Sequence, residues 1–214
     1  GKTLYTSDDG HYALFPLIPG VDPNRQDPAL MEAVGAALGE LHSTLESYPR
    51  EKRPGLATYS QIGQVHPHLP NPATMRPQNV GIDNPTEDVE ALFDWWRAEV
   101  ARIEQWKLSA YDSLPHQVIH GDFTPANTLI LDDPVAGKRV SAILDFDFAL
   151  VDARAVDVAA GLYFTMRLWE SPDPWPVAES FCRGYARWVQ PTTQEVEATV
   201  SYTHLTLPTS SQVV

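Results

Sequence analysis

The chain has 214 residues, of which 43% are hydrophobic and 20% charged, a composition typical of a globular protein of one or two domains with a sizeable core. Its formal net charge of −13 argues against nucleic acid as a partner, because an acidic surface repels a phosphate backbone. No stretch approaches the roughly 18 apolar residues of a membrane span, and the single cysteine, Cys182, excludes an internal disulfide, so we expect a cytoplasmic protein with no membrane contact and with this thiol buried.

The first residues predict a β-hairpin joined to a connector. Residues 2–15 form two strand-like runs around Asp9-Gly10, a dipeptide that favours a tight turn. Residues 16–20, with two prolines and a glycine, end both helix and strand and suit a link between two lobes. Because a two-stranded hairpin is marginal alone, it either packs on the following helices or is the remnant of a larger sheet. We expect the remnant, since the chain opens with Gly1 where a start methionine would stand, which suggests an upstream truncation.

A helix and a long loop follow the connector. Asp27-Pro28 predicts a helix start, because a capping side chain is followed by proline at the first helical position. This helix should bury one apolar stripe, which consists of Leu30, Val34, Leu38, Leu41 and Leu45. Residues 48–85, rich in proline, asparagine and glycine, predict a long loop. His66 and His68 in this loop have no cysteine or clustered carboxylate nearby, so we interpret them as exposed polar residues rather than metal ligands.

A second helix is predicted from Thr86, with Glu87 and Asp88 in the first turn, where the helix dipole favours acids. Its tryptophans could stack on a base or a sugar, but apolar residues at helical spacing are usually core. The predicted buried stripe comprises Val89, Leu92, Phe93, Trp96, Val100 and Ile103. The rest of the chain predicts short strands at 117–119, 128–131 and 140–144, and helices at 153–170 and 177–189.

Three side chains that bear oxygen are predicted to converge near the middle of the chain. His120-Gly-Asp122 follows a buried strand and enters a short loop, and Asn127 starts the next strand, 127 − 122 = 5 positions on. A second strand pair, which turns at residues 132–137, delivers Asp145 at its end and returns the chain beside Asn127. Asp and Asn also cap turns, so a lone motif would carry little weight; the full pattern is more specific.

Phosphoryl transfer requires this kind of set. Mg²⁺ takes one or two hard protein oxygens together with phosphates and water, and a separate carboxylate orients the acceptor hydroxyl and takes its proton. One Asp and one Asn therefore suffice for the metal. The pattern from Val118 to Leu131, followed by residues 142–149, resembles the catalytic and metal-binding loops of the aminoglycoside phosphotransferase superfamily, whose members share the protein-kinase fold.

That resemblance covers residues 11–190 and implies an α+β, protein-kinase-like fold: a remnant of the small β lobe with the hinge at residues 1–19 and a helical large lobe at 20–199. It implies the following roles: Asp122 as catalytic base, Asn127 and Asp145 as Mg²⁺ ligands, His120 as a brace of the loop, and Asp157 as a helix-start carboxylate bonded back to the catalytic loop. Asp147 is the first alternative base. Residues 200–214 resemble a translated sequencing adapter, and we expect them to be a non-native tail with few contacts.

The resemblance also implies where ATP would bind. Residues 12–20 resemble the last small-lobe strand and the hinge, so Pro16 would offer its carbonyl and Ile18 its N–H to adenine, and Leu129 would lie beneath the base. The glycine-rich loop and the phosphate-binding lysine of the family do not occur in this sequence. We therefore expect the chain as given to show no appreciable kinase activity.

The expected function is transfer of a phosphoryl group from ATP, with Mg²⁺, to a hydroxyl of a small molecule. The segment 145–157 looks most similar to bacterial type II homoserine kinases, while aminoglycoside and amino-sugar acceptors stay open. The alternative is a catalytically silent kinase-like module that binds a nucleotide or a partner. A protein kinase is disfavoured by Gly121, which stands where protein kinases carry arginine, and by the lack of an Ala-Pro-Glu activation segment.

Overall fold

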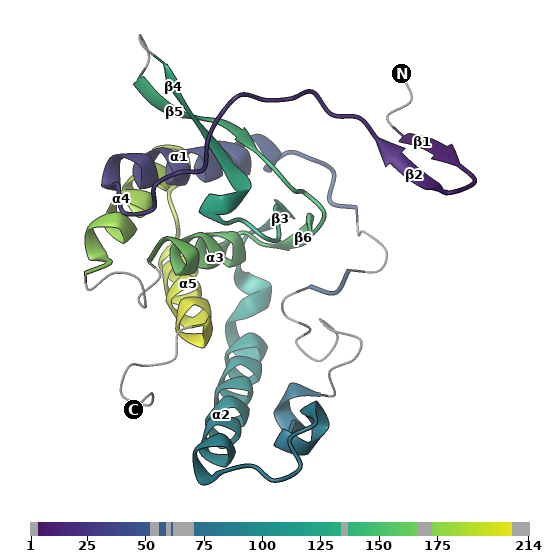
Figure 1. Ribbon diagram of the computed structural model, residues 1–214. Helices are drawn as coiled ribbons and strands as arrows, with labels where there is room; N and C mark the ends of the chain where they lie inside the picture. Colours follow the sequence, from purple (N-terminus) through teal and green to yellow (C-terminus); the bar gives the residue numbers. More distant parts are fainter. Residues whose placement is uncertain are drawn as a thin grey trace.

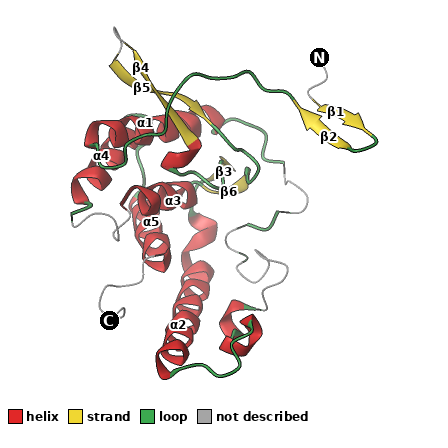
Figure 2. Ribbon diagram, viewed as in Figure 1, coloured by secondary structure: helices red, strands yellow, loops and turns green. Residues whose placement is uncertain are grey.

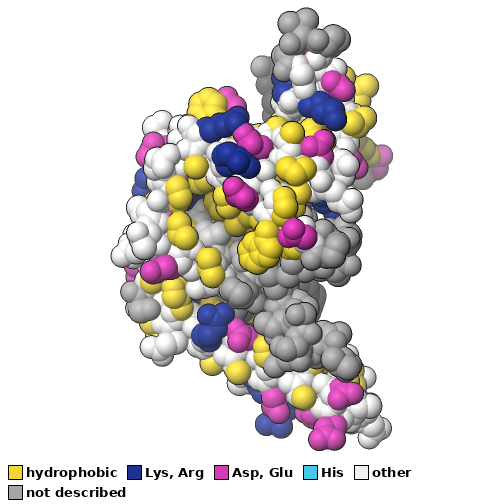
Figure 3. Space-filling view, turned by 90° about the vertical axis from the view of Figure 1, so that its left-hand side faces the viewer, with side chains coloured by type: hydrophobic (Ala, Val, Ile, Leu, Met, Phe, Trp, Pro, Cys, Tyr) yellow, Lys and Arg dark blue, Asp and Glu magenta, His cyan; other side chains and the backbone are white. Residues whose placement is uncertain are grey.

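The computed structural model describes residues 4–51, 56–58, 61, 71–133, 137–166 and 173–206, so His66 and His68 lie outside the described residues. Figure 1 shows a group of packed helices, a hairpin that stands apart at the N-terminus, and one long helix that projects from the body. Most of the ordered elements are helical (Figure 2). The face shown in Figure 3 mixes hydrophobic side chains with both signs of charge. No described helix combines the length and the hydropathy needed to cross a membrane.

The N-terminal hairpin consists of β1 (Leu4–Ser7) and β2 (Gly10–Ala13), paired so that Ser7 lies opposite Gly10. Its turn is therefore Asp8-Asp9, one residue earlier than the predicted Asp9-Gly10. Several large side chains on this hairpin and the following connector are exposed; they are Tyr5, Tyr12, Leu14, Phe15 and Leu17. Figure 1 shows the hairpin away from the helices, to which a long extended connector leads.

The main core lies between α1 (Pro28–Leu45) and α4 (Trp175–Tyr185). Asp27 caps α1 as predicted, since its carboxylate accepts from the backbone N–H groups of Ala29 and Leu30. The two helices cross closely because glycines stand at the crossing, and a Cβ on Gly184 would overlap the backbone of Glu32. The chief buried members of this core are Met31, Val34, Leu38, Phe123 and Phe181. Cys182 of α4 is an exposed residue, so the expected full burial of its thiol is wrong, although partial burial raises the pKa of the thiol.

Replacing Gly184 by alanine should destabilise the fold. The added methyl group meets main-chain atoms of α1, which cannot move aside as a flexible side chain can, so we expect a loss of about 3 kcal/mol in the free energy of unfolding. Urea denaturation measures this loss. Gly10→Ala is the matched control, because its Cβ would make only ordinary contacts with the Tyr12 ring. Equal stability of the two variants would contradict the close crossing.

The long helix α2 (Glu87–Ala110) differs most from expectation. Of its predicted buried stripe only Val100 is buried, and Leu92 is 56% exposed. The helix packs mainly on short turns of 3-10 helix rather than on the core; these are η2 (Pro72–Thr74), η3 (Pro77–Val80) and η4 (Tyr111–Ser113). Amphipathic spacing was therefore a correct guide to the helix but a wrong guide to its burial.

The strands that carry the candidate site form two antiparallel pairs. The first joins β3 (His116–Ile119) to β6 (Leu150–Ala153), and the second joins β4 (Thr128–Asp133) to β5 (Gly137–Ile143). A short 3-10 turn, η5 (Pro125–Asn127), precedes β4. The strand β6 was not predicted, and its last residue, Ala153, is the predicted first residue of a helix. That helix, α3 (Ala155–Met166), starts two residues later, and its predicted last residues lie outside the described ones.

The last described helix, α5 (Thr193–Thr206), packs against α3. The side chain of Glu195 is buried at its start and accepts from Arg154 Nε at 2.5 Å and from Arg154 Nη2 at 3.0 Å. The helix continues past residue 199, and Thr203 is buried. The expectation of a tail with few contacts from residue 200 is therefore wrong at Thr203, while residues 207–214 lie outside the described part.

Candidate active site

A sharp turn brings the chain from β3 into the predicted catalytic loop. Gly121, directly after His120, has φ +84°, a left-handed conformation that glycine adopts without strain. A Cβ at this position would overlap the backbone of Phe148, so the loop and the segment after Asp145 approach each other more closely than a larger residue would allow. This contact gives a physical reason for glycine where protein kinases carry arginine.

The buried carboxylate of Asp157 stabilises this turn by hydrogen bonds to its backbone. Its Oδ2 accepts from the His120 backbone N–H at 2.7 Å, and its Oδ1 accepts from the Gly121 backbone N–H at 2.8 Å. His42 of α1 donates to the same Oδ2 from Nε2 at 3.1 Å, and Tyr185 of α4 donates to His42 Nδ1 at 3.0 Å. Burial raises the pKa of Tyr185, which keeps its hydroxyl protonated as the donor. Side chains from α1, α3 and α4 thus form one chain of hydrogen bonds that ends at the Asp157 carboxylate.

His120 links the loop to the strand end that precedes Asp145. Its Nδ1 accepts from the Asp122 backbone N–H at 3.3 Å, and its Nε2 lies 2.8 Å from the carbonyl oxygen of Leu144. A carbonyl can only accept and an amide N–H can only donate, so these partners assign a neutral ring protonated on Nε2. The ring also packs edge-on against Phe123 and tilted against Phe146. His120 therefore fixes the spacing between the two halves of the site.

Asp122 and Asn127 are in direct contact. The Asn127 side-chain N–H₂ donates to the Asp122 backbone carbonyl at 2.9 Å and to its carboxylate Oδ2 at 3.3 Å. Because both bonds use the amide nitrogen, the amide oxygen is left as the group that can coordinate a cation. Burial raises the pKa of the Asp122 carboxyl and the nearby Asp145 charge adds to this, although the Asn127 hydrogen bond opposes the shift.

Asp145 lies beside Asn127 at the end of the second strand pair. The Leu144 backbone N–H donates to the Asn127 carbonyl at 2.8 Å, which places Asp145 next along the chain. Asp145 has φ +61°, a left-handed conformation uncommon for any residue but glycine. Its side chain is exposed, and Oδ1 accepts from the Asp147 N–H at 3.4 Å. The backbone of Asp147 therefore turns back toward the Asp145 side chain.

A magnesium ion fits this donor set. Asp145 offers carboxylate oxygen and Asn127 offers amide oxygen, the hard ligands that Mg²⁺ prefers, and one or two protein ligands suffice when phosphates complete the shell. In the part of the chain that the structure describes, no group of three or more His, Cys, Asp or Glu side chains could hold a metal ion.

The connector crosses over the strand pair next to Leu129. The Val21 N–H donates to the Ile130 carbonyl at 2.9 Å, the Ile130 N–H donates to the Val21 carbonyl at 2.8 Å, and the Ser141 hydroxyl donates to the Pro19 carbonyl at 2.9 Å. Gly20 packs so tightly on Leu129 that a Cβ would lie 2.7 Å from the leucine Cβ. Leu129 is half-buried beneath this crossing, whereas Pro16 and Ile18 are exposed on the stretch before it.

Sequence reasoning missed two parts of the site. It did not assign His42 or Tyr185 to the support of Asp157, although a histidine within an apolar helical stripe was a visible signal. It also missed a cavity of about 440 Å³ between residues 22–26 and Ala126 of the catalytic loop. Polar side chains from the segment after the connector line this cavity beside the catalytic loop.

The fold and the site together define a protein-kinase-like chain of the α+β class, mostly helical. An amicoumacin kinase, solved with AMP-PNP, Ca²⁺ and Ami, superposes with a TM-score of 0.62 at 15% identity over 96% of this chain and 59% of that one. An aminoglycoside phosphotransferase from Streptomyces rimosus, solved with ADP and streptomycin, gives a TM-score of 0.57 at 17% identity over 96% of this chain and 74% of that one.

The chain belongs to the family described as the phosphotransferase enzyme family (APH), whose sequence pattern matches residues 2–198. A homoserine kinase from Nitrobacter winogradskyi is 30% identical over 160 residues, which are 74% of this chain and 42% of that protein. A homoserine kinase from Gluconacetobacter diazotrophicus is 31% identical over 159 residues, which are 74% of this chain and 44% of that protein. The chain thus spans less than half the length of these curated relatives.

Proposed function

We propose that this segment supplies the metal and acceptor half of a kinase that transfers the γ-phosphoryl group of ATP, with Mg²⁺, to a hydroxyl of a small molecule. One observation carries the proposal: Asn127 binds Asp122 through its amide nitrogen, so its amide oxygen is available as a ligand for a cation and the Asp122 carboxylate is available to the acceptor. In this assignment residues 1–19 belong to the small lobe and hinge, and residues 20–199 form the large lobe.

The proposed reaction assigns a separate task to each group. The Asp122 carboxylate accepts the acceptor's hydroxyl proton while that oxygen bonds to the γ-phosphorus and the bond to the ADP oxygen breaks. Asn127 and Asp145 would hold Mg²⁺, which when bound neutralises phosphate charge. Pro16 and Ile18 would face adenine through backbone atoms, and Leu129 would support the ring.

The curated relatives make homoserine the first acceptor to test, followed by aminoglycosides and amino sugars. ATP chemistry of this kind belongs in the cytoplasm. The second candidate function is a catalytically silent module that binds nucleotide without transfer. The partly buried Asp122 carboxylate disfavours it, because its raised pKa suits proton transfer, which a module that only binds nucleotide does not need.

Replacing Asp145 by alanine should abolish Mg²⁺-dependent nucleotide binding, since one of two protein ligands is lost. Calorimetry in the longest natural version of the protein that carries this segment, titrated with ATP in the presence and absence of Mg²⁺, measures the effect. Asp132→Ala is the matched control, because Asp132 is exposed on the same strand pair and its substitution removes the same negative charge. Unchanged affinity for Mg·ATP in the Asp145 variant would refute the metal assignment.

A further inference from the structure

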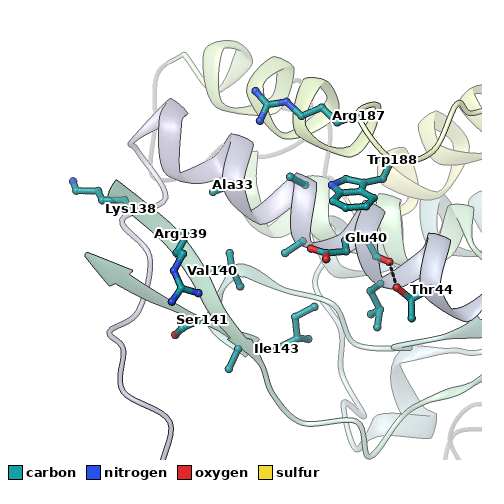
Figure 4. Close-up of a pocket in the computed structure, with 14 residues that line it drawn as sticks. Ala33, Glu40, Thr44, Lys138, Arg139, Val140, Ser141, Ile143, Arg187 and Trp188 are labelled. Carbon is teal, nitrogen blue, oxygen red and sulfur yellow. Dashed lines mark hydrogen bonds between the residues drawn. The ribbon is translucent and has the colours of Figure 1, made fainter. Parts of the chain in front are cut away.

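A groove of about 650 Å³ lies between the second strand pair and the main helices, and none of the candidate site residues lines it. One side is β5, the other side is one face of α1, and Arg187 and Trp188, just after α4, close one part of it. Figure 4 shows Val140, Ser141 and Ile143 along the strand, with Glu40, Thr44 and Trp188 on the helical side.

The free edge of β5 faces this groove. All six consecutive residues from Lys138 to Ile143 line it, whereas one face of a strand would contribute only every second residue. In the described part of the chain β5 pairs with β4 alone, and no backbone hydrogen bond joins residues 138–143 to any other described residue. The outward backbone N–H and C=O groups are therefore available to a further strand.

The opposite side of the groove would allow another backbone to approach. Its helical face carries small side chains at Ala33, Ala36 and Ala37, which are only partly buried. The indole ring of Trp188 is 50% exposed and lies against this face (Figure 4). An extended peptide would thus find a hydrogen-bonding edge on one side and an apolar surface on the other, the two requirements of strand addition.

The side chains that line the groove include more bases than acids. Three basic residues, Lys138, Arg139 and Arg187, line it together with a single acid, Glu40, although the whole chain has a net charge of −13. Lys138 lies 3.7 Å from Asp27, and Arg187 pairs with Glu32. Arg139 pairs with no acid among the described residues. Arg139, on the β5 strand itself, is therefore the cation that an acidic ligand in this groove would pair with.

From these observations we infer that the groove binds an acidic, extended peptide segment of a partner protein, which adds a third strand to β5. A second copy of this chain is a poorer occupant, because edge-to-edge pairing of two β5 strands would bring two sets of the same basic side chains together. The inference does not rest on the proposed function. It adds a means of regulation, because β4 begins directly after Asn127 and β5 leads through Leu144 to Asp145, so a third strand would restrict the motion of both residues.

Calorimetry with the 214-residue chain tests the inference. The probe is a blocked six-residue peptide in which glutamate and valine alternate, and we expect micromolar binding. The same peptide with alternate backbone nitrogens methylated, which cannot donate to a strand edge, should bind at least tenfold more weakly, as should a peptide with lysine in place of glutamate. Backbone amide exchange at residues 138–143 should slow when the acidic peptide is bound.

Two substitutions place the binding in the groove. Arg139→Glu should weaken binding at least tenfold, whereas Arg102→Glu, on exposed α2, should leave it unchanged. Ala37→Leu fills the groove from the helical side and should also weaken binding, with circular dichroism as the check on folding. Equal binding of the methylated peptide, equal binding of the lysine peptide, or no binding to the folded chain would each overturn the inference. Citrate bound as tightly as the peptide would also overturn it, because charge alone would then account for the affinity.

Discussion

Replacing Asp122 by asparagine should lower the rate of phosphoryl transfer by about 10²–10⁴ and leave Mg·ATP affinity nearly unchanged. The reason is the geometry of its contacts: the carboxylate receives one N–H from Asn127 and is not required to hold the cation, so its loss removes the proton acceptor alone. Steady-state kinetics with the true acceptor, in the longest natural version of the protein, measures the rate. Calorimetry with Mg·ATP measures the affinity.

Asp147→Asn is the matched control for this prediction, because Asp147 follows Asp145 and is the alternative base. Its rate should change by less than about tenfold. A larger loss of rate in Asp147→Asn than in Asp122→Asn would mean that Asp147 is the catalytic base. The raised pKa of Asp122 gives a second readout: only the deprotonated carboxylate can take a proton, so activity should fall on the acid side at a pH above the usual range of an aspartate, about 4. That acid limb should be absent from the residual activity of Asp122→Asn.

Replacing Asp157 by alanine should cost the 214-residue chain about 3–5 kcal/mol in its free energy of unfolding. The substitution leaves the buried N–H groups of His120 and Gly121 without their acceptor and removes the partner of His42. Urea denaturation followed by circular dichroism measures the loss. An exposed carboxylate, Asp83, provides the control, and Asp83→Ala should change stability by less than about 0.5 kcal/mol.

The loss in the free energy of unfolding for Asp157→Asn should lie between the losses for Asp157→Ala and Asp83→Ala, because an amide keeps one acceptor oxygen for the turn. This intermediate variant keeps the prediction testable if the alanine variant does not fold. A loss below about 1 kcal/mol in Asp157→Ala would mean that water or a neighbouring group replaces the carboxylate, and the turn at Gly121 would then need another support.

The sequence predicted the local parts of the site better than its distant supports. Asp122, Asn127 and the loop between them are close in the chain, so spacing alone brings them together. His42 and Tyr185 reach the loop only through tertiary packing, from 78 and 65 positions away, and no local pattern reveals such a contact (120 − 42 and 185 − 120). The burial of Asp157 was likewise beyond what its position in a motif could show.

Two elements of the fold show the same limit. The strand β6 has only four residues and includes an aspartate, so no local pattern predicted it. It is a strand because it pairs with β3, more than 30 residues earlier. The stripe on α2 correctly predicted a helix, but periodicity reports which side is apolar and not how much of it a neighbour covers. The left-handed conformation of Asp145 is permitted by aspartate but not required by it.

The position of Asp157 also constrains how this chain can fold during synthesis. When residue 150 leaves the ribosomal exit tunnel, every group proposed for catalysis is already outside. The Asp157 carboxylate that anchors the turn at Gly121 is still inside the tunnel at that moment. Tyr185, which contacts His42, follows Asp157 by a further 28 residues (185 − 157). The turn must therefore wait for later sequence, as expected of contacts with large separation along the chain. A nascent chain that ends at residue 150 would contain Asp122, Asn127 and Asp145 but lack the carboxylate that holds the turn at Gly121 in place.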